Sequence, residues 1–162
     1  MPSAFWRSTT NPGALTSPTL PLASMLRSAT FDDRPEVARL LTDYLFEFDG
    51  RTEPYPYLDA YWTEDERLPF LIELDGRAVG ICLIRVRDDG WSIAEFSVVP
   101  SERRSGVGRA AVDELAERAR TAGARYLEAK IHPDNGGAIH FWTAIGFVAI
   151  PSPDVVTTRR AL

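Results

Sequence analysis

A polar loop with two nearby glycines carries the clearest chemical signal in the sequence. It reads Arg103-Arg104-Ser105-Gly106-Val107-Gly108-Arg109, and it lies between an apolar run and an amphipathic segment. Glycines let a ligand approach the backbone closely, and the free N–H groups of a first helical turn attract an anion together with the helix dipole. The three arginines add positive charge. The loop therefore predicts a site for a pyrophosphate.

Three interpretations of this loop compete. The plainest is a helix start with solvated arginines, since short glycine patterns recur by chance. A second is a dinucleotide site, because Gly106-x-Gly108-x-x-Ala111 matches the G-x-G-x-x-A pattern and Glu128 follows about 20 residues later. We reject it, because that pattern needs a tight turn directly after the first strand of a parallel sheet, whereas about half a dozen residues separate Val99 from Gly106. The third interpretation depends on the rest of the chain.

Glu95 is the candidate base. It lies in an otherwise apolar strand, and alternation places it on the face shared with Trp91, Ile93 and Val99. A carboxylate there would have a raised pKa and could accept a proton, directly or through water. The alternative is a structural role, because a hairpin would bring Arg85 diagonal to Glu95, within reach of an ion pair. The sequence leaves both roles open.

The elements around the loop indicate an α+β fold. Asp75-Gly76 and Asp89-Gly90 separate three apolar runs, which is a strong signal for hairpins. After the loop the pattern changes to helix, strand, helix and strand, a β-α-β arrangement. The expected strands cover residues 25–30, 69–74, 77–87, 91–99 and 125–131, with one more from 147 and a candidate edge strand over 155–160. The expected helices cover residues 35–48, 58–63, 107–122 and 135–145.

Composition narrows the class of protein. Residues 1–24 are rich in Pro, Ser and Thr and predict a disordered tail, which is dispensable or precedes a natural start at Met25. Residues 25–162 then form a single domain. The net charge of −5 argues against a nucleic-acid partner. No stretch approaches the roughly 20 apolar residues of a membrane span, and the lone Cys82 forms no disulfide. We expect a cytoplasmic protein with surface-exposed His132 and His140 and no metal site.

Two motifs together resemble the GNAT superfamily of N-acetyltransferases. The loop matches its acetyl-CoA motif, Arg/Gln-x-x-Gly-x-Gly/Ala, and the preceding residues 96–100 look like its strand-end pattern. Its second motif has Asn, then Ala, an aromatic pair and Gly-Phe, and residues 135–147 resemble it. Two motifs in the right order, about 30 residues apart, are far more specific than either alone. The resemblance extends over about residues 25–150, and residues 46–49, 57–62 and 94–96 look like a group of predicted bacterial acetyltransferases.

The resemblance implies a fold and a co-substrate. The fold would be α+β, with a mixed, mostly antiparallel twisted central sheet flanked by helices on both faces, in the order β-α-α-β-β-β-α-β-α-β. The sheet would be splayed at the strand over residues 91–99. Acetyl-CoA would be the co-substrate, without a metal. The residues implied in coenzyme binding are Val98, Val99, Arg103, Arg104, Ser105, Gly106, Val107, Gly108, Arg109, Asn135 and Trp142.

The resemblance also implies a reaction, from which the sequence departs at one position. The acetyl group would pass to a primary amine of a small molecule or peptide by direct attack in a ternary complex. Many members use a Tyr on the last helix as the acid toward the leaving thiolate, and Trp142 occupies that position here. An indole N–H donates a hydrogen bond but is not a useful proton source. The alternative is therefore a non-catalytic module that binds or senses acyl-CoA on the same fold.

The acceptor side is predicted from aromatic residues. Tyr57, Tyr61 and Trp62 are expected to line the acceptor pocket, because aromatic faces beside carboxylates suit an ammonium group. The plain alternative is a loop whose aromatics cap the core. The expected partners are acetyl-CoA and an amine, and a homodimer stays open because members of the superfamily are often dimers.

Overall fold

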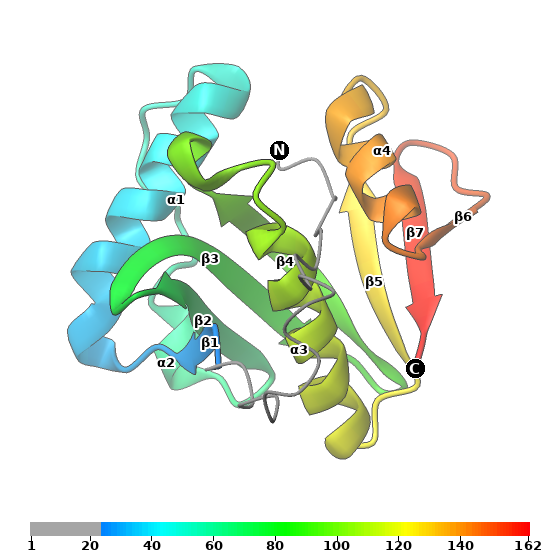
Figure 1. Cartoon of the computed structure of the whole chain (residues 1–162), viewed down its shortest axis with the longest axis horizontal. Helices are drawn as coiled ribbons and strands as arrows, with labels where there is room; N and C mark the ends of the chain where they lie inside the picture. Colours follow the sequence, from blue (N-terminus) through cyan, green and yellow to red (C-terminus); the bar gives the residue numbers. More distant parts are fainter. Residues whose placement is uncertain (1–23) are drawn as a thin grey trace, which may run out of the picture.

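The computed structural model describes residues 24–162. A single seven-stranded sheet runs through it in the order β1-β2-β3-β4-β5-β7-β6 (Figure 1). Every neighbouring pair is antiparallel except β4 with β5, which is parallel. The strands are β1 (Leu26–Ser28), β2 (Arg67–Leu74), β3 (Arg77–Val86), β4 (Gly90–Val98), β5 (Tyr126–Ile131), β6 (Val148–Ile150) and β7 (Val156–Ala161). The mixed, mostly antiparallel α+β class is confirmed.

Helices cover both faces of this sheet. They are α1 (Arg34–Asp49), α2 (Ala60–Thr63), α3 (Val107–Thr121) and α4 (Gly136–Ala144), with short 3-10 turns η2 (Phe31–Asp33) and η3 (Pro100–Glu102). The larger apolar cluster joins α3 and α4 to one face, and both helices lie in front of the sheet in Figure 1. The smaller cluster joins α1 and α2 to the other face. Burial of these two apolar layers fixes the helices on the sheet.

The hairpin between β2 and β3 follows from its two turn residues. Asp75 and Gly76 have φ angles of 52° and 76°. Two successive positive φ angles define a type I′ turn, whose twist matches that of the flanking strands. The Asp-Gly signals therefore identified the strand boundaries of the antiparallel half.

The last strand differs from its predicted place. Residues 155–160 were expected to form an edge strand, but β7 lies between β5 and β6, so that expectation is wrong. The alternation is weak because a polar residue occupies a buried position. Thr158 is fully buried, and its Oγ1 donates to the Ala129 carbonyl at 2.9 Å. The edge is β6, with exposed Val148 and Ile150.

The expectation for residues 1–24 lies outside the described residues, apart from Ser24. The Ser24 hydroxyl bonds to Glu114 of α3, whose carboxylate also accepts from the Met25 and Leu26 amides at 2.8 and 3.1 Å. These bonds dock the start of β1 on α3. Within residues 24–162, no helix is long and apolar enough to cross a membrane.

Replacement of Gly80 should destabilise the contact between β3 and β4. A Cβ at Gly80 would lie 2.3 Å from the Ser97 carbonyl oxygen, a backbone atom that cannot move aside alone. We expect Gly80→Ala to lower the free energy of unfolding by about 1–3 kcal/mol in urea denaturation. Gly136→Ala is the control, because a Cβ there meets nothing within 4 Å. Equal stability of both variants would contradict this account.

Candidate active site

The site forms where β4 and β5 separate. The two strands pair only from Gly90 with Tyr126 to Ile93 with Ala129, although β4 continues to Val98. Beyond that point they diverge into an open V (Figure 1). The sheet is therefore splayed at β4, as the resemblance implied.

A β-bulge in β4 decides which way its side chains face. Leu83 of β3 lies opposite Glu95, whereas the next residue, Ile84, lies opposite Ile93. Ala94 is therefore an extra residue, and the alternation of faces shifts there. The prediction that Glu95 shares a face with Trp91 and Ile93 is wrong for this reason. Both apolar residues face α3 and α4, whereas Leu83, the cross-strand partner of Glu95, belongs to the layer under α1 and α2.

The end of β4 offers backbone groups to the gap. The Val99 N–H donates to the Val79 carbonyl of β3 at 2.8 Å. Because successive residues of a strand point their main-chain groups in opposite directions, Val98 directs its N–H and C=O away from β3. Those groups face the side from which β5 has diverged. The carbonyl accepts from the Arg103 Nε, no β5 residue pairs with the N–H, and Val98 itself is fully buried.

The predicted anion loop follows directly. Gly106 is the residue before α3 and has a φ of 86°, a left-handed conformation that glycine adopts without strain. The first backbone bond of the helix runs from the Ala110 N–H to the Gly106 carbonyl. The amides of Val107, Gly108 and Arg109 precede it, and no described side chain caps the helix start. These amides point along the helix axis, where the helix dipole favours an anion.

Around these amides the loop is held by its own contacts. The side chain of Val107 packs in the core, and the Ser105 hydroxyl donates to the Glu102 carbonyl at 2.6 Å. Arg104 is exposed and Arg109 is half-buried. The loop is thus anchored on one side and open to solvent at Arg104 and Ser105.

Arg103 makes a bridge instead of extending freely. Its Nε donates to the Val98 carbonyl at 2.8 Å, and its terminal nitrogens pair with both carboxylate oxygens of Glu47 on α1. The guanidinium lowers the pKa of Glu47 through these hydrogen bonds. The bridge connects α1 to the end of β4.

Glu95 stands without an ionic partner. Among residues 24–162 it makes no ion pair, and the bulge brings Arg85 opposite Ser92, so the predicted ion pair with Arg85 does not form. Burial raises the pKa of Glu95 to about 7, against a smaller lowering by Arg51. A carboxyl group with that pKa can take up and release a proton near neutral pH.

Two cavities meet beside Glu95. The inner one, about 210 Å³, lies in the V and is lined by Glu95 and Trp142 among others. The outer one, about 620 Å³, is lined by charged residues that include Glu47, Asp49 and Arg51. Residues common to both walls are Tyr44, Phe48, His132 and Asn135. The two cavities are therefore adjacent, and the inner one reaches the gap in the sheet.

Tyr44 is the site residue that the sequence analysis missed. It lies at the apolar helical spacing of α1, which does not by itself distinguish a core position from a cavity wall. The structure places it half-buried on the walls of both cavities. Burial raises its pKa to about 12, and the charges of Glu95 and Glu47 act in the same direction. A tyrosine in helical apolar spacing beside exposed Phe48 gave no separate signal.

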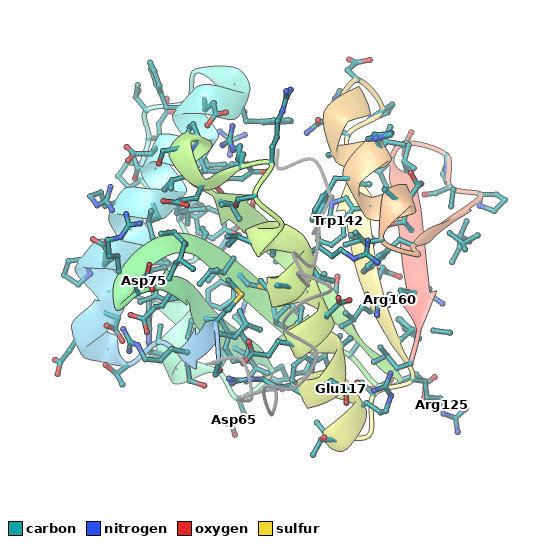
Figure 2. The ribbon with its side chains drawn as sticks, viewed as in Figure 1. Asp65, Asp75, Glu117, Arg125, Trp142 and Arg160 are labelled. Carbon is teal, nitrogen blue, oxygen red and sulfur yellow. The ribbon has the colours of Figure 1, made fainter. Side chains whose placement is uncertain are left out.

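Trp142 and Asn135 frame the inner cavity from α4. Trp142 is buried among Phe96, Phe141 and Phe147, with ring centroids 4.9–5.3 Å apart, and it lies on the inner side of α4 (Figure 2). The Asn135 side chain caps α4 by accepting from the Ala138 N–H at 3.0 Å. Both predicted residues are therefore at the gap, held by packing and by a helix cap.

The predicted acceptor aromatics lie elsewhere. Tyr61 is 2% exposed and belongs to the core, and the Trp62 indole donates to the Ala29 carbonyl at 3.0 Å. Tyr57 is exposed. None of the three lines either cavity described above, because α2 packs its aromatics against the sheet. Tyr44 and Phe48 of α1 supply aromatic walls there instead.

The remaining candidates for chemistry occupy ordinary positions. His132 and His140 are exposed, as predicted, and the His132 Nδ1 accepts from the Asp134 N–H at 3.1 Å. Glu128 pairs with Arg159 at 2.8 Å across the sheet. Cys82 is buried, which raises the pKa of its thiol. In the described part of the chain, no group of three His, Cys, Asp or Glu side chains is placed to hold a metal.

Comparisons with known proteins agree with this geometry. Residues 34–147 match the Acetyltransferase (GNAT) family, and the chain belongs to that family. An L-2,4-diaminobutyric acid acetyltransferase of Nocardia farcinica is 30% identical over 129 residues, which cover 75% of this chain and 63% of the relative. The chain thus spans less than two thirds of the length of that curated relative.

Solved structures share the fold. An acetyltransferase of Thermus thermophilus superposes with a TM-score of 0.71 at 21% identity, over 85% of this chain and 96% of that one. The PaiA N-acetyltransferase of Thermoplasma acidophilum, crystallised in complex with coenzyme A, gives 0.65 at 13% identity, over 85% and 98%. The resemblance to GNAT proteins stated from the two motifs is confirmed.

Removal of the Glu95 charge should stabilise the protein in a pH-dependent way. The folded-state pKa of about 7 exceeds the ordinary 4.5, so stability falls as pH rises between these values and the cost is complete above pH 7. We expect Glu95→Gln to raise the free energy of unfolding by up to about 3 kcal/mol at pH 8 and by much less at pH 4.5.

Chemical denaturation at the two pH values measures this difference. Glu66→Gln is the control, because Glu66 is exposed and its replacement should change little at either pH. A stabilisation by Glu95→Gln that is the same at both pH values would rule out the raised pKa.

Proposed function

We propose that this chain transfers the acetyl group of acetyl-CoA to a primary amine of a small molecule or peptide. The observation that supports the proposal is the divergence of β4 and β5, with Glu95 on the gap and Val98 three residues further along the unpaired part of β4. The amides at the start of α3 follow a few residues later in the chain. A thioester arm, a diphosphate and a proton acceptor can then be held together.

In this proposal the coenzyme binds mainly to backbone. The pantetheine arm would extend along Val98 and Val99 as an additional strand, with Asn135 and Trp142 framing its end. The pyrophosphate would lie on the amides from Arg104 to Arg109, where the helix dipole and arginine charge favour it. A site built from main-chain amides needs the glycines at 106 and 108 more than any particular side chain.

The acceptor would enter through the outer cavity. That cavity carries Glu47, Asp49 and Asp134 beside Arg51, with Tyr44 and Phe48 as aromatic walls. Carboxylates and aromatic faces suit an ammonium group on its way to the gap. The related diaminobutyric acid acetyltransferase is named for an acceptor of this class, a small amine.

Direct attack needs a neutral amine next to the thioester. Glu95, with its pKa near 7, is the base in this proposal and accepts the amine proton directly or through water. Positioning both reactants in these adjacent cavities supplies the rest of the rate enhancement by making the step effectively intramolecular.

Thiol release from acetyl-CoA over a panel of amines tests the function. The panel should hold diamines, amino acids including L-2,4-diaminobutyrate, and a peptide with a free N-terminus. Turnover with any of them supports the enzyme. If calorimetry shows tight binding of coenzyme A but no amine causes thiol release, the protein is instead a non-catalytic acyl-CoA-binding module. Trp142 at the position of the acid is the feature that favours this alternative. If coenzyme A gives no heat of binding, both proposals are wrong.

Replacement of Glu95 should slow the chemistry and spare the coenzyme. We expect Glu95→Gln to lower kcat by about 10²–10⁴-fold, the usual contribution of a general base. Wild-type kcat should rise through pH 7 as the carboxyl group ionises, and the variant should lose this rise. The dissociation constant of coenzyme A should change less than about twofold by calorimetry, within 0.4 kcal/mol. Unchanged turnover would remove Glu95 from the mechanism.

A reversed charge on the loop should weaken coenzyme binding. Arg104 is exposed before the first turn of α3, so Arg104→Glu places a negative charge beside the bound pyrophosphate. We expect about tenfold weaker coenzyme A binding at low salt, with the loss reduced at high salt. Arg125→Glu is the matched control, since exposed Arg125 lies beyond the other end of α3 (Figure 2). Equal effects of the two variants would indicate net charge alone.

A further inference from the structure

The proposed reaction leaves one proton without a donor. When the thioester breaks, its sulfur departs as a thiolate and must be protonated. Trp142 lines the inner cavity at the place where a tyrosine would be expected, but its indole is not an acid at neutral pH. Some other group on the wall of this cavity has to supply the proton.

Four side chains that can give up a proton line the inner cavity: Tyr44, Glu95, Lys130 and His132. Glu95 is occupied as the base. Lys130 and His132 are exposed, and the His132 Nδ1 already accepts a backbone bond. Tyr44 is half-buried and lies on the walls of both cavities, and the charge of Glu95 acts on its hydroxyl.

We propose that Tyr44 is the catalytic acid that protonates the leaving thiolate. This inference rests on the proposed function. The amine reaches the thioester in its neutral form, its ammonium proton having passed to solvent. Its nitrogen attacks the carbonyl carbon, so a C–N bond forms and the C–S bond breaks. Glu95 takes the amine proton, and the Tyr44 hydroxyl gives its proton to the sulfur. The phenolate then recovers a proton from the Glu95 carboxyl group, and an amide and a thiol leave. Both residues return to their starting states without another reactant.

The size of the inner cavity brings the groups together. At about 210 Å³ it is much smaller than the outer cavity, so a thioester bound in it would lie near several of its lining side chains. Two contacts fix Tyr44 there. Its ring stacks on Phe48 with centroids 6.3 Å apart, and the bridge from Glu47 to Arg103 holds this turn of α1 against β4.

The charge of Glu95 controls the acidity of Tyr44 during the reaction. The negative charge of Glu95 helps to hold the proton on Tyr44, whose pKa burial has already raised to about 12. Once Glu95 has taken the amine proton, that charge is gone and the pKa of Tyr44 falls. The phenol therefore becomes a better acid at the stage when the thiolate appears, and it holds its proton before then.

Tyr44→Phe tests the role, since it removes a single hydroxyl and keeps the ring that packs on Phe48. We expect kcat to fall by about 10²–10³-fold, with coenzyme A binding by calorimetry and thermal unfolding close to wild type. Tyr126→Phe is the matched control, because Tyr126 is also half-buried but lines neither cavity and lies where β4 and β5 still pair. Its turnover should match that of the wild-type protein.

The leaving-group dependence separates an acid from a structural residue. Acetyl thioesters of pantetheine analogues with more acidic thiols need less help from an acid. The deficit of Tyr44→Phe should therefore shrink as the thiol pKa falls, so that log kcat depends more steeply on thiol pKa than in the wild type. A deficit that stays constant, or a kcat within threefold of wild type, overturns the proposal.

His132→Asn addresses the rival donor. If the steeper dependence on thiol pKa appears in this variant and not in Tyr44→Phe, the acid is His132 and the proposal for Tyr44 is wrong. An inactive wild-type protein over the whole amine panel would be a failure of the proposed function itself, which the wild-type assay reveals before any variant is made.

Discussion

Main-chain hydrogen bonding between β4 and β5 stops after Ile93 and Ala129, and the site depends on that interruption. Every backbone N–H and C=O away from water needs a partner, so a strand edge that has lost its neighbour requires another one. In this chain residues 93–96 of β4 line the inner cavity, Val98 follows on the same strand without a β5 partner, and α3 begins only a few residues later. The gap, the inner cavity and the loop before α3 thus all follow from the separation of β4 and β5.

The bulge at Ala94 adds the chemical group to this opening. By inserting one residue, it turns Glu95 away from Trp91 and Ile93 and toward the side of α1. A carboxyl group there loses water without gaining an ion pair, which is why its pKa rises. Protein interiors avoid such groups, since an unpaired buried charge costs stability. Because the buried Glu95 carboxylate costs stability, packing alone does not explain why a glutamate occupies this position.

Local chemistry in the sequence identified much of this arrangement. Asp75-Gly76 marked its hairpin because a type I′ turn favours those residues, and Gly106 and Gly108 marked the loop before α3 because they lack side chains. The two GNAT motifs identified the family. The same resemblance named Asn135 and Trp142, and both line the inner cavity.

What the sequence could not predict depends on contacts between distant segments. The face of Glu95 was wrong because a bulge leaves no mark in the pattern of alternation. Tyr44 was missed because a helical apolar position looks the same whether it meets a core or a cavity wall. Tyr61 and Trp62 were expected beside the acceptor, but α2 turns them into the core. In each case the partner lies on another element of the fold.

The guanidinium of Arg103 connects the two parts of the site that the ligands would occupy. It joins the Val98 carbonyl, on the proposed coenzyme side, to Glu47, on the proposed acceptor side. A coenzyme arm that bonded to the same carbonyl would compete with this side chain, which also lines the outer cavity. Thermodynamic linkage would then make the two affinities interdependent by an equal factor in each direction. Each ligand would thus change the affinity for the other although the two never touch.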